Sequence, residues 1–184
     1  MDKIAHISAV FRILLQIILV IMPLSIASSW IIAPHDIVFH GKLIGIFYSS
    51  PIPVNLHIGY AITFEIKVLG FLVNMLTVGT VMLILYFLVQ LFKNYQHKKI
   101  FSLENVSIIR NIGYALIAWQ VLIPIKQALL LLLLTWRNGP GERIVAANFS
   151  DNNVAVILIA FVVILISWVM AEGHKLQEEQ EYTV

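Results

Sequence analysis

The chain has 184 residues, of which 60% are hydrophobic and only 12% are charged, and its formal net charge is +2. In a soluble domain about a quarter of the residues are charged, so this composition indicates an integral membrane protein. The small net charge and the lack of a basic stripe argue against direct binding of nucleic acid. Because the chain has no cysteine, it has no disulfide framework, thiolate metal site or cysteine nucleophile.

Long apolar runs predict four transmembrane helices. A helix that crosses a hydrocarbon core of roughly 30 Å needs about 20 apolar residues, and such runs lie at residues 8–28, 68–92, 108–135 and 153–171. The first run also resembles a secretory signal, because "SIASS" is similar to a cleavage site, but it is longer than a typical signal core. We therefore expect a single all-α domain, a four-helix transmembrane bundle over residues 1–184.

Lysine and arginine predict the orientation of these helices, because cytoplasmic loops carry an excess of both. The connection between the second and third runs and the start of the first run contain Lys93, Lys98, Lys99, Lys3 and Arg12. Both segments should therefore be cytoplasmic. This orientation places the loop at residues 29–67 outside and the tail at residues 172–184 inside, so that both termini are cytoplasmic.

The outer loop, residues 29–67, has the least helical sequence. Pro34, Pro51 and Pro53 separate runs rich in Ile, Val, Phe and Tyr, which are typical of strands. In "VNLHIGYAITFEIKV" the polar residues recur at every second position over part of the run. We expect a small extracytoplasmic element of strand and loop.

Lys126 lies in an apolar sequence, about ten residues or roughly 15 Å of helix before Trp136. A charge at the bilayer centre costs around 2.5 to 3.5 kcal/mol, so Lys126 is a candidate for a buried polar site. The neutral groups expected at similar depth are Asn74, Thr77 and Gln120. Three interpretations are open. Lys126 snorkels to the outer interface, which we favour, or pairs inside the bundle, or serves a ligand, ion or proton site.

Three histidines of the outer loop, His35, His40 and His57, are weak candidates for a metal site that would also draw on Asp36 or Glu65. Zinc ligands usually lie at tighter spacings, so we expect neither a metal nor a cofactor. The chain also lacks a glycine-rich phosphate loop, a GxSxG elbow and an HExxH motif. We therefore expect a protein that is not an enzyme.

Opposite charges meet on the predicted cytoplasmic side. The basic residues of the inner loop and the acidic residues of the tail are Lys98, Lys99, Arg110, Glu178, Glu179 and Glu181. Gly173 is a candidate break before the tail, and Ser102 is a candidate helix cap with Asn105 at the third position. The tail either locks the bundle by pairing with the loop or docks a partner. We favour the lock, because Leu176 and Val184 would anchor it.

Two segments, "KKIFSLENVSIIRNIGYAL" and "AEGHKLQEEQEYTV", carry a family resemblance. The first has an aliphatic-Phe-Ser step, an Asn and Arg-x-Ile-Gly, and the second has a Gly, Leu-x-Glu-Glu and a final Thr-Val. The matching residues are Ile100, Phe101, Ser102, Asn105, Arg110, Ile112, Gly113, Gly173, Leu176, Glu178, Glu179, Thr183 and Val184. Together with four spans and a sizeable loop after the first, they make the chain resemble the bacterial membrane-protein family catalogued as domain of unknown function two-nine-seven-five.

This resemblance covers most of the chain, implies a bacterial cytoplasmic (inner) membrane location and assigns no activity. Members of the family are often encoded beside a helix-turn-helix regulator of the Xre type, which implies a cytoplasmic partner of that kind. We expect a non-enzymatic membrane sensor or interaction protein in the lipid bilayer. The alternative is a small transporter or channel component that uses the polar site around Lys126. Whether the chain forms a homo-oligomer stays open.

Overall fold

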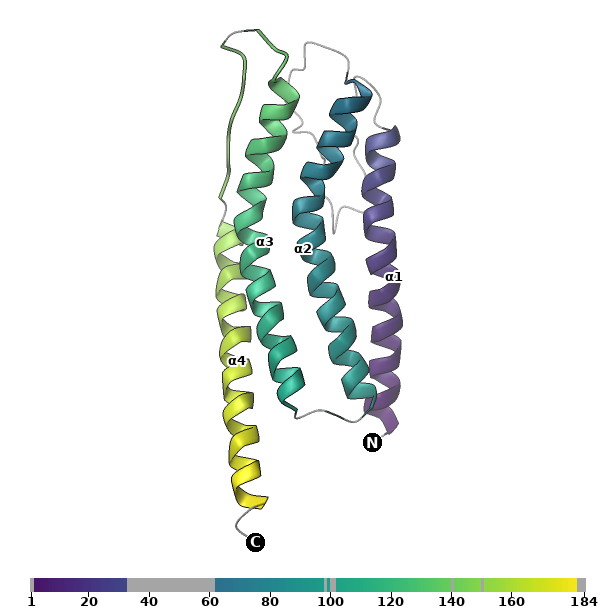
Figure 1. Ribbon diagram of the computed structural model, residues 1–184, viewed down its shortest axis with the longest axis vertical. Coiled ribbons are helices and arrows are strands. Elements are labelled where there is room, and N and C mark those ends of the chain that lie inside the picture. The colour runs from purple at the N-terminus through teal and green to yellow at the C-terminus, as the bar shows by residue number, and fades with distance from the viewer. Residues whose placement is uncertain are drawn as a thin grey trace. The chain divides into compact units, whose positions relative to one another are not determined.

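The computed structural model describes residues 2–32, 62–97, 99, 102–139, 141–149 and 151–181. These residues form four helices and no strand (Figure 1). The helices are α1 (Asp2–Ile32), α2 (Phe64–Gln96), α3 (Leu103–Thr135) and α4 (Asp151–Glu181). Each expected apolar run lies inside one of them, which confirms the prediction of an all-α fold with four helices.

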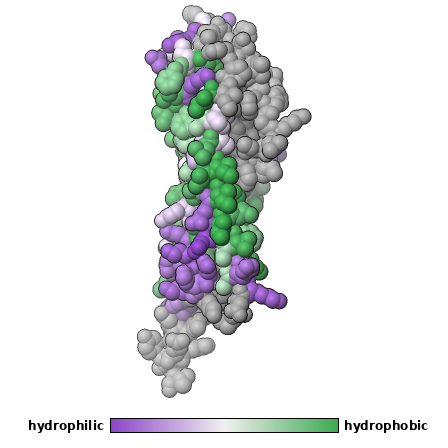
Figure 2. Space-filling view, turned by 90° about the vertical axis from the view of Figure 1, so that its right-hand side faces the viewer, coloured by the Kyte–Doolittle hydropathy of each residue, from purple (hydrophilic) through white to green (hydrophobic). Residues whose placement is uncertain are grey.

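All four helices are long and apolar enough to cross a membrane. Each contains 31 or 33 residues, which corresponds to about 46 to 50 Å of helix against a hydrocarbon core of roughly 30 Å. The helices are therefore tilted, or their ends extend beyond the apolar layer. Figure 2 shows one face on which apolar side chains form a band, with hydrophilic side chains gathered below it.

The start of α2 corrects the strand predicted for "VNLHIGYAITFEIKV". The helix begins at Phe64, and the Lys67 N–H donates to the carbonyl oxygen of Thr63 over 3.1 Å. Phe64 is exposed although Ile62 and Ile66, two positions to either side, are buried, so the alternation of a strand is broken here. The strand prediction is therefore wrong for the end of this run, and the rest of the expected outer element, residues 33–61, lies outside the described residues.

The chain divides into two compact units. Unit 1 consists of Met1–Ile21, Gly79–Val121 and Phe149–Val184, and unit 2 consists of Met22–Val78 and Leu122–Asn148. Unit 1 therefore contains all of α4 and one part of each of the other three helices. Unit 2 contains the remaining parts of α1, α2 and α3.

Within unit 1 each helix packs against the next one along the chain. Phe11 of α1 stacks on Phe92 of α2 with 5.4 Å between the ring centroids. The buried core between α2 and α3 consists of Ile84, Leu91, Ile108, Ile112 and Ala115. The contact between α3 and α4 is close, because a Cβ atom added at Gly113 would lie 2.5 Å from Cγ1 of Ile164. Unit 1 is thus a bundle of four helices.

Within unit 2 two close contacts depend on small side chains. The six-membered ring of Trp30, at the end of α1, occupies the space that a Cβ atom at Gly70 of α2 would need. The hydroxyl of Thr135, at the end of α3, donates to the carbonyl oxygen of Leu131 over 2.8 Å and accepts the N–H of Ile144 over 2.9 Å. Thr135 is fully buried, so it joins α3 to the segment that follows it.

This following segment, residues 142–149, has no regular secondary structure and lies alongside α3 (Figure 1). Besides the bond to Thr135, the N–H of Asn148 donates to Oε1 of Gln127 over 3.1 Å. Two side chains of α3 therefore satisfy backbone groups of a segment that has no helical or strand partners of its own.

Candidate functional site

Among the polar residues singled out around Lys126, Asn74 and Thr77 bond to backbone groups of their own helix. Lys126 is half-buried, and Asn74, Thr77 and Gln120 are buried. Nδ2 of Asn74 donates to the carbonyl oxygen of Gly70 over 3.0 Å, and the Thr77 hydroxyl donates to the carbonyl oxygen of Asn74 over 3.2 Å. Both side chains are thus bonded within their own helix.

Lys126 itself has no hydrogen bond or ion pair with any residue in the described part of the chain. Gln120 belongs to unit 1, whereas Lys126, Asn74 and Thr77 belong to unit 2. The three interpretations of Lys126 therefore stay predictions.

The three candidate metal-binding histidines, His35, His40 and His57, lie outside the described residues. Within the residues that are described, no group of three or more His, Cys, Asp or Glu side chains is placed to hold a metal ion. Glu65, considered as an additional metal ligand, lies instead near Arg137, with 3.9 Å between Oε2 and Nη2.

The turn between α2 and α3 contains the expected helix cap. The Asn105 N–H donates to Oγ of Ser102 over 3.3 Å, and the Val106 N–H donates to the carbonyl oxygen of Ser102 over 3.1 Å. The Ser102 hydroxyl therefore satisfies an N–H group at the start of α3 that has no partner within the helix, and the Ser102 carbonyl accepts the first bond of the helix. The predicted cap is confirmed.

The side chain of Asn105 has a second role that the sequence pattern did not predict. Its Oδ1 accepts a hydrogen bond of 2.8 Å from Nδ2 of Asn94 at the end of α2, and its Nδ2 donates over 2.6 Å to the carbonyl oxygen of Lys99. Asn105 is fully buried. One amide thus joins α2, the turn and α3. The signal in the sequence was an Asn where a capping box usually has Glu or Gln.

The C-terminal tail is a continuation of α4. The helix passes through Gly173 to Glu181, so the expected break at Gly173 is wrong. A Cβ atom added at Gly173 would meet nothing within 4 Å. A glycine in a helix costs only about 1 kcal/mol relative to alanine, and this cost has not ended the helix here.

Within unit 1 the end of α4 projects past the start of α3. The two helices are antiparallel, and Ile164 of α4 lies against Gly113 of α3. Ten residues after Ile164, α4 near His174 reaches the level of Leu103, which lies ten residues before Gly113 at the start of α3. The remaining residues of α4 extend roughly 10 Å beyond that level (Figure 1). We call residues 172–181 the α4 extension.

The charges of the α4 extension and of the turn are described only in part. Glu172 and Lys99 are exposed, Arg110 is half-buried and Leu176 is 54% exposed. The structure does not describe Lys98 or the side chains of Glu178, Glu179 and Glu181, and Val184 also lies outside it. The lock between tail and loop therefore stays a prediction.

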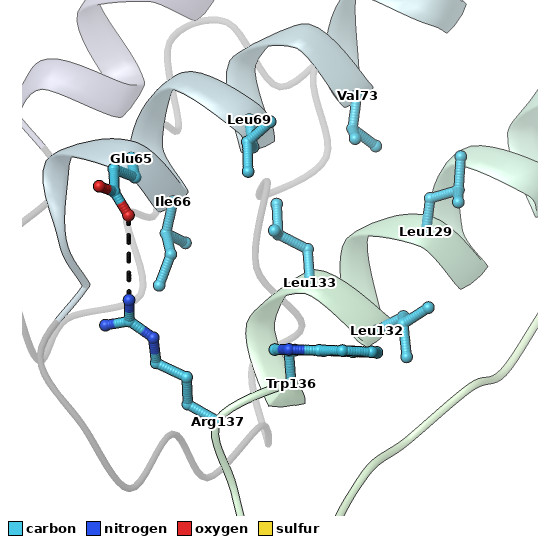
Figure 3. A pocket seen from close by; sticks show the side chains of 9 residues that line it. All are labelled: Glu65, Ile66, Leu69, Val73, Leu129, Leu132, Leu133, Trp136 and Arg137. Atoms are coloured by element: carbon cyan, nitrogen blue, oxygen red, sulfur yellow. Dashed lines mark ion pairs between the residues drawn. The ribbon is translucent and has the colours of Figure 1, made fainter.

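A cavity of about 460 Å³ lies between α2 and α3 in unit 2 (Figure 3). Its walls are mostly apolar and consist of Ile66, Leu69, Val73, Leu129, Leu132 and Leu133, while Glu65, Trp136 and Arg137 line its end. In Figure 3 the side chains of Glu65 and Arg137 point toward each other across that end. The guanidinium of Arg143 lies 4.7 Å from the ring centroid of Trp136, which adds a second cation nearby. We call this the α2–α3 cavity.

A comparison with protein families finds a match over most of the chain. The model described as "Protein of unknown function (DUF2975)" matches residues 54–184, which is well over half of the chain and includes α2, α3 and α4. No curated protein and no solved structure shows significant similarity to the chain.

Proposed function

The chain belongs to the DUF2975 family of proteins of unknown function, and we propose that it is a non-enzymatic membrane protein that docks a cytoplasmic partner on the α4 extension. The proposal includes a bacterial inner-membrane location with both termini in the cytoplasm. The Lys-rich turn between α2 and α3 supports that orientation, because cytoplasmic loops carry the excess of lysine and arginine.

The observation that carries the proposal is the projection of α4 past the start of α3. A tail that locked the bundle would fold back onto the turn, whereas α4 continues as a helix past the start of α3. Leu176 and Glu172 are exposed on this helix. The geometry thus supports docking over the lock.

The chemistry of the partner follows from the charge of the α4 extension. Its acidic residues are Glu172, Glu178, Glu179 and Glu181, and its only basic residue other than His174 is Lys175. A basic protein surface complements this charge, and complementary charge increases association rates and specificity. Proteins that bind DNA carry such basic surfaces. The helix-turn-helix regulator implied by the family resemblance is therefore the partner that we propose.

A continuous helix also gives the protein a means of signalling. α4 runs without a break from Ile164, which contacts Gly113 of α3, to Glu181. A shift or rotation of α4 against α3 would therefore move the docking surface with it, as in other helix shifts that transmit a signal. In this proposal the membrane part senses a change and the α4 extension reports it.

Co-purification from native membranes tests the proposal. We expect the wild-type chain to retain a basic cytoplasmic protein, identified by mass spectrometry, and the variant Glu178→Gln/Glu179→Gln/Glu181→Gln to lose it. Glu104→Gln is the matched control, because Glu104 is an exposed acidic residue in the first turn of α3. Equal recovery of the same partner by the triple variant would contradict docking through these charges.

The transport alternative has less support. It depends on a connected polar path around Lys126, but Asn74 and Thr77 are bonded within α2. No hydrogen bond among the described residues joins either of them to Lys126, so we do not propose transport.

A further inference from the structure

We propose that the α2–α3 cavity binds one membrane phospholipid that carries both a phosphate and a primary ammonium group, with an acyl chain between the two helices. The proposal does not depend on the docking function, because it concerns unit 2 alone. Three features of the cavity carry it: its apolar walls, the pair of opposite charges at its end, and its direction.

The apolar walls fit a hydrocarbon chain. Leu69 and Val73 of α2 face Leu129 and Leu133 of α3 across the cavity (Figure 3). From Glu65 to Val73 the wall follows about 12 Å of helix, close to the roughly 15 Å depth of one leaflet. The volume of about 460 Å³ also lies in the range of small-molecule sites, about 300 to 1,000 Å³.

The charges at the end of the cavity fit a zwitterionic head group. Arg137 Nη2 and Glu65 Oε2 are 3.9 Å apart, which is too long for a hydrogen bond. Their side chains are 50% and 81% exposed, so the pair by itself contributes little to stability. A phosphate would accept hydrogen bonds from the Arg137 fork, and an ammonium group would donate to the Glu65 carboxylate.

The direction of the cavity matches that of a lipid in a bilayer. The charged residues lie at one end of α2 and α3, and the apolar wall continues along both helices away from that end. Trp136 lines the same end, and tryptophan is enriched where a membrane meets water. The head group and the chain of a phospholipid would therefore each meet the matching part of the cavity.

A primary amine distinguishes this ligand from the other common head groups. Phosphatidylcholine has a phosphate and a positive charge but no N–H donor, and phosphatidylglycerol has a phosphate but no positive charge. We expect the full-length protein, exchanged into vesicles of equal parts of the three lipids and studied by native mass spectrometry, to retain phosphatidylethanolamine. Equal retention of all three lipids would overturn the proposal.

Four variants separate specific binding from general contact with lipid. Glu65→Gln should lower the retention of phosphatidylethanolamine relative to the other two lipids roughly fivefold. This factor is equivalent to about 1 kcal/mol, the upper limit for an exposed ion pair. Arg137→Gln should lower retention of all three lipids. Leu133→Trp fills the cavity and should abolish retention, while Leu158→Trp, which changes a 60% exposed residue of α4, should leave it unchanged.

The two charge variants keep the test valid if Leu133→Trp fails to fold, because both change exposed side chains. Retention that is unaffected by Glu65→Gln and Arg137→Gln would contradict the proposed head-group contacts. A second copy of the chain in the cavity is the competing occupant. It would appear as a dimer that Leu133→Trp dissociates, with no lipid bound, and that result would also overturn the proposal.

Discussion

The side chain of Asn94 donates a hydrogen bond of 2.8 Å to Oδ1 of Asn105, and this bond joins the end of α2 to the first turn of α3. The same Asn105 amide donates to the carbonyl oxygen of Lys99 within the turn. A single buried side chain thus fixes the connection between the two helices that form the core of unit 1. The stability of this connection can be tested directly.

Replacement of Asn105 by alanine should lower the melting temperature in detergent. It leaves the Asn94 amide and the Lys99 carbonyl without this partner, and a buried polar group left unpaired costs about 1 to 3 kcal/mol. Glu104→Ala changes the exposed neighbouring residue and should stay within about 0.5 kcal/mol of wild type. If Asn105→Ala has the same melting temperature as the Glu104→Ala control, the amide does not hold the turn.

Replacement by alanine should lower the stability of the protein at Gly113 and raise it at Gly79. A Cβ atom at Gly113 would lie 2.5 Å from the Ile164 side chain and 3.2 Å from the carbonyl oxygen of Ala160, so α3 and α4 must separate. At Gly79 a Cβ atom meets nothing within 4 Å, and alanine should stabilise the helix by up to about 1 kcal/mol. Thermal unfolding of the two variants checks this, and a Gly113→Ala variant as stable as Gly79→Ala would refute the close contact.

Thr135→Val should release the segment that follows α3. Valine keeps the shape of the side chain but cannot accept the N–H of Ile144, so residues near Arg143 should open more often. Limited trypsin digestion measures this as faster cleavage after Arg143. Thr135→Ser retains the hydroxyl and serves as the control. Equal cleavage rates for Thr135→Val and wild type would show that this bond does not restrain the segment.

Lys126→Met should leave the protein as stable as wild type or more stable. The ammonium group has no bond to the described residues, and a charge within an apolar helix costs about 2.5 to 3.5 kcal/mol at the bilayer centre. The additional change Asn74→Ala should show no coupling to it, because Asn74 bonds to Gly70. A fall of many degrees in the melting temperature on Lys126→Met, rescued by a change at Asn74, would indicate a buried polar pair.

The four helices were predictable because runs of about 20 apolar residues have few other stable structures in a membrane. The start of α2 was not, because polar residues at positions 63, 65 and 67 alternate like those of a strand. The exposed Phe64 between the buried Ile62 and Ile66 breaks that alternation, and burial depends on neighbouring helices. Gly173 was misread because a glycine in open space costs too little to end a helix.

The Ser102 cap was predictable because its donor and acceptor lie within three residues. The bond between Asn94 and Asn105 was not, because it depends on how the turn folds. The α2–α3 cavity was not predictable either, because it also depends on how the chain folds. Its walls come from segments that are about 60 residues apart in the sequence, and only the packed helices bring Leu69 and Leu133 together.

The most direct test of the account is site-specific photo-crosslinking in living cells. A photoreactive residue is placed at position 176 of the α4 extension or at position 158 of the same helix, both of which are more than half exposed. We predict that position 176 forms an adduct with a basic cytoplasmic protein and that position 158 does not. Adducts from position 176 only to the turn between α2 and α3 of the same chain would contradict docking and establish the lock.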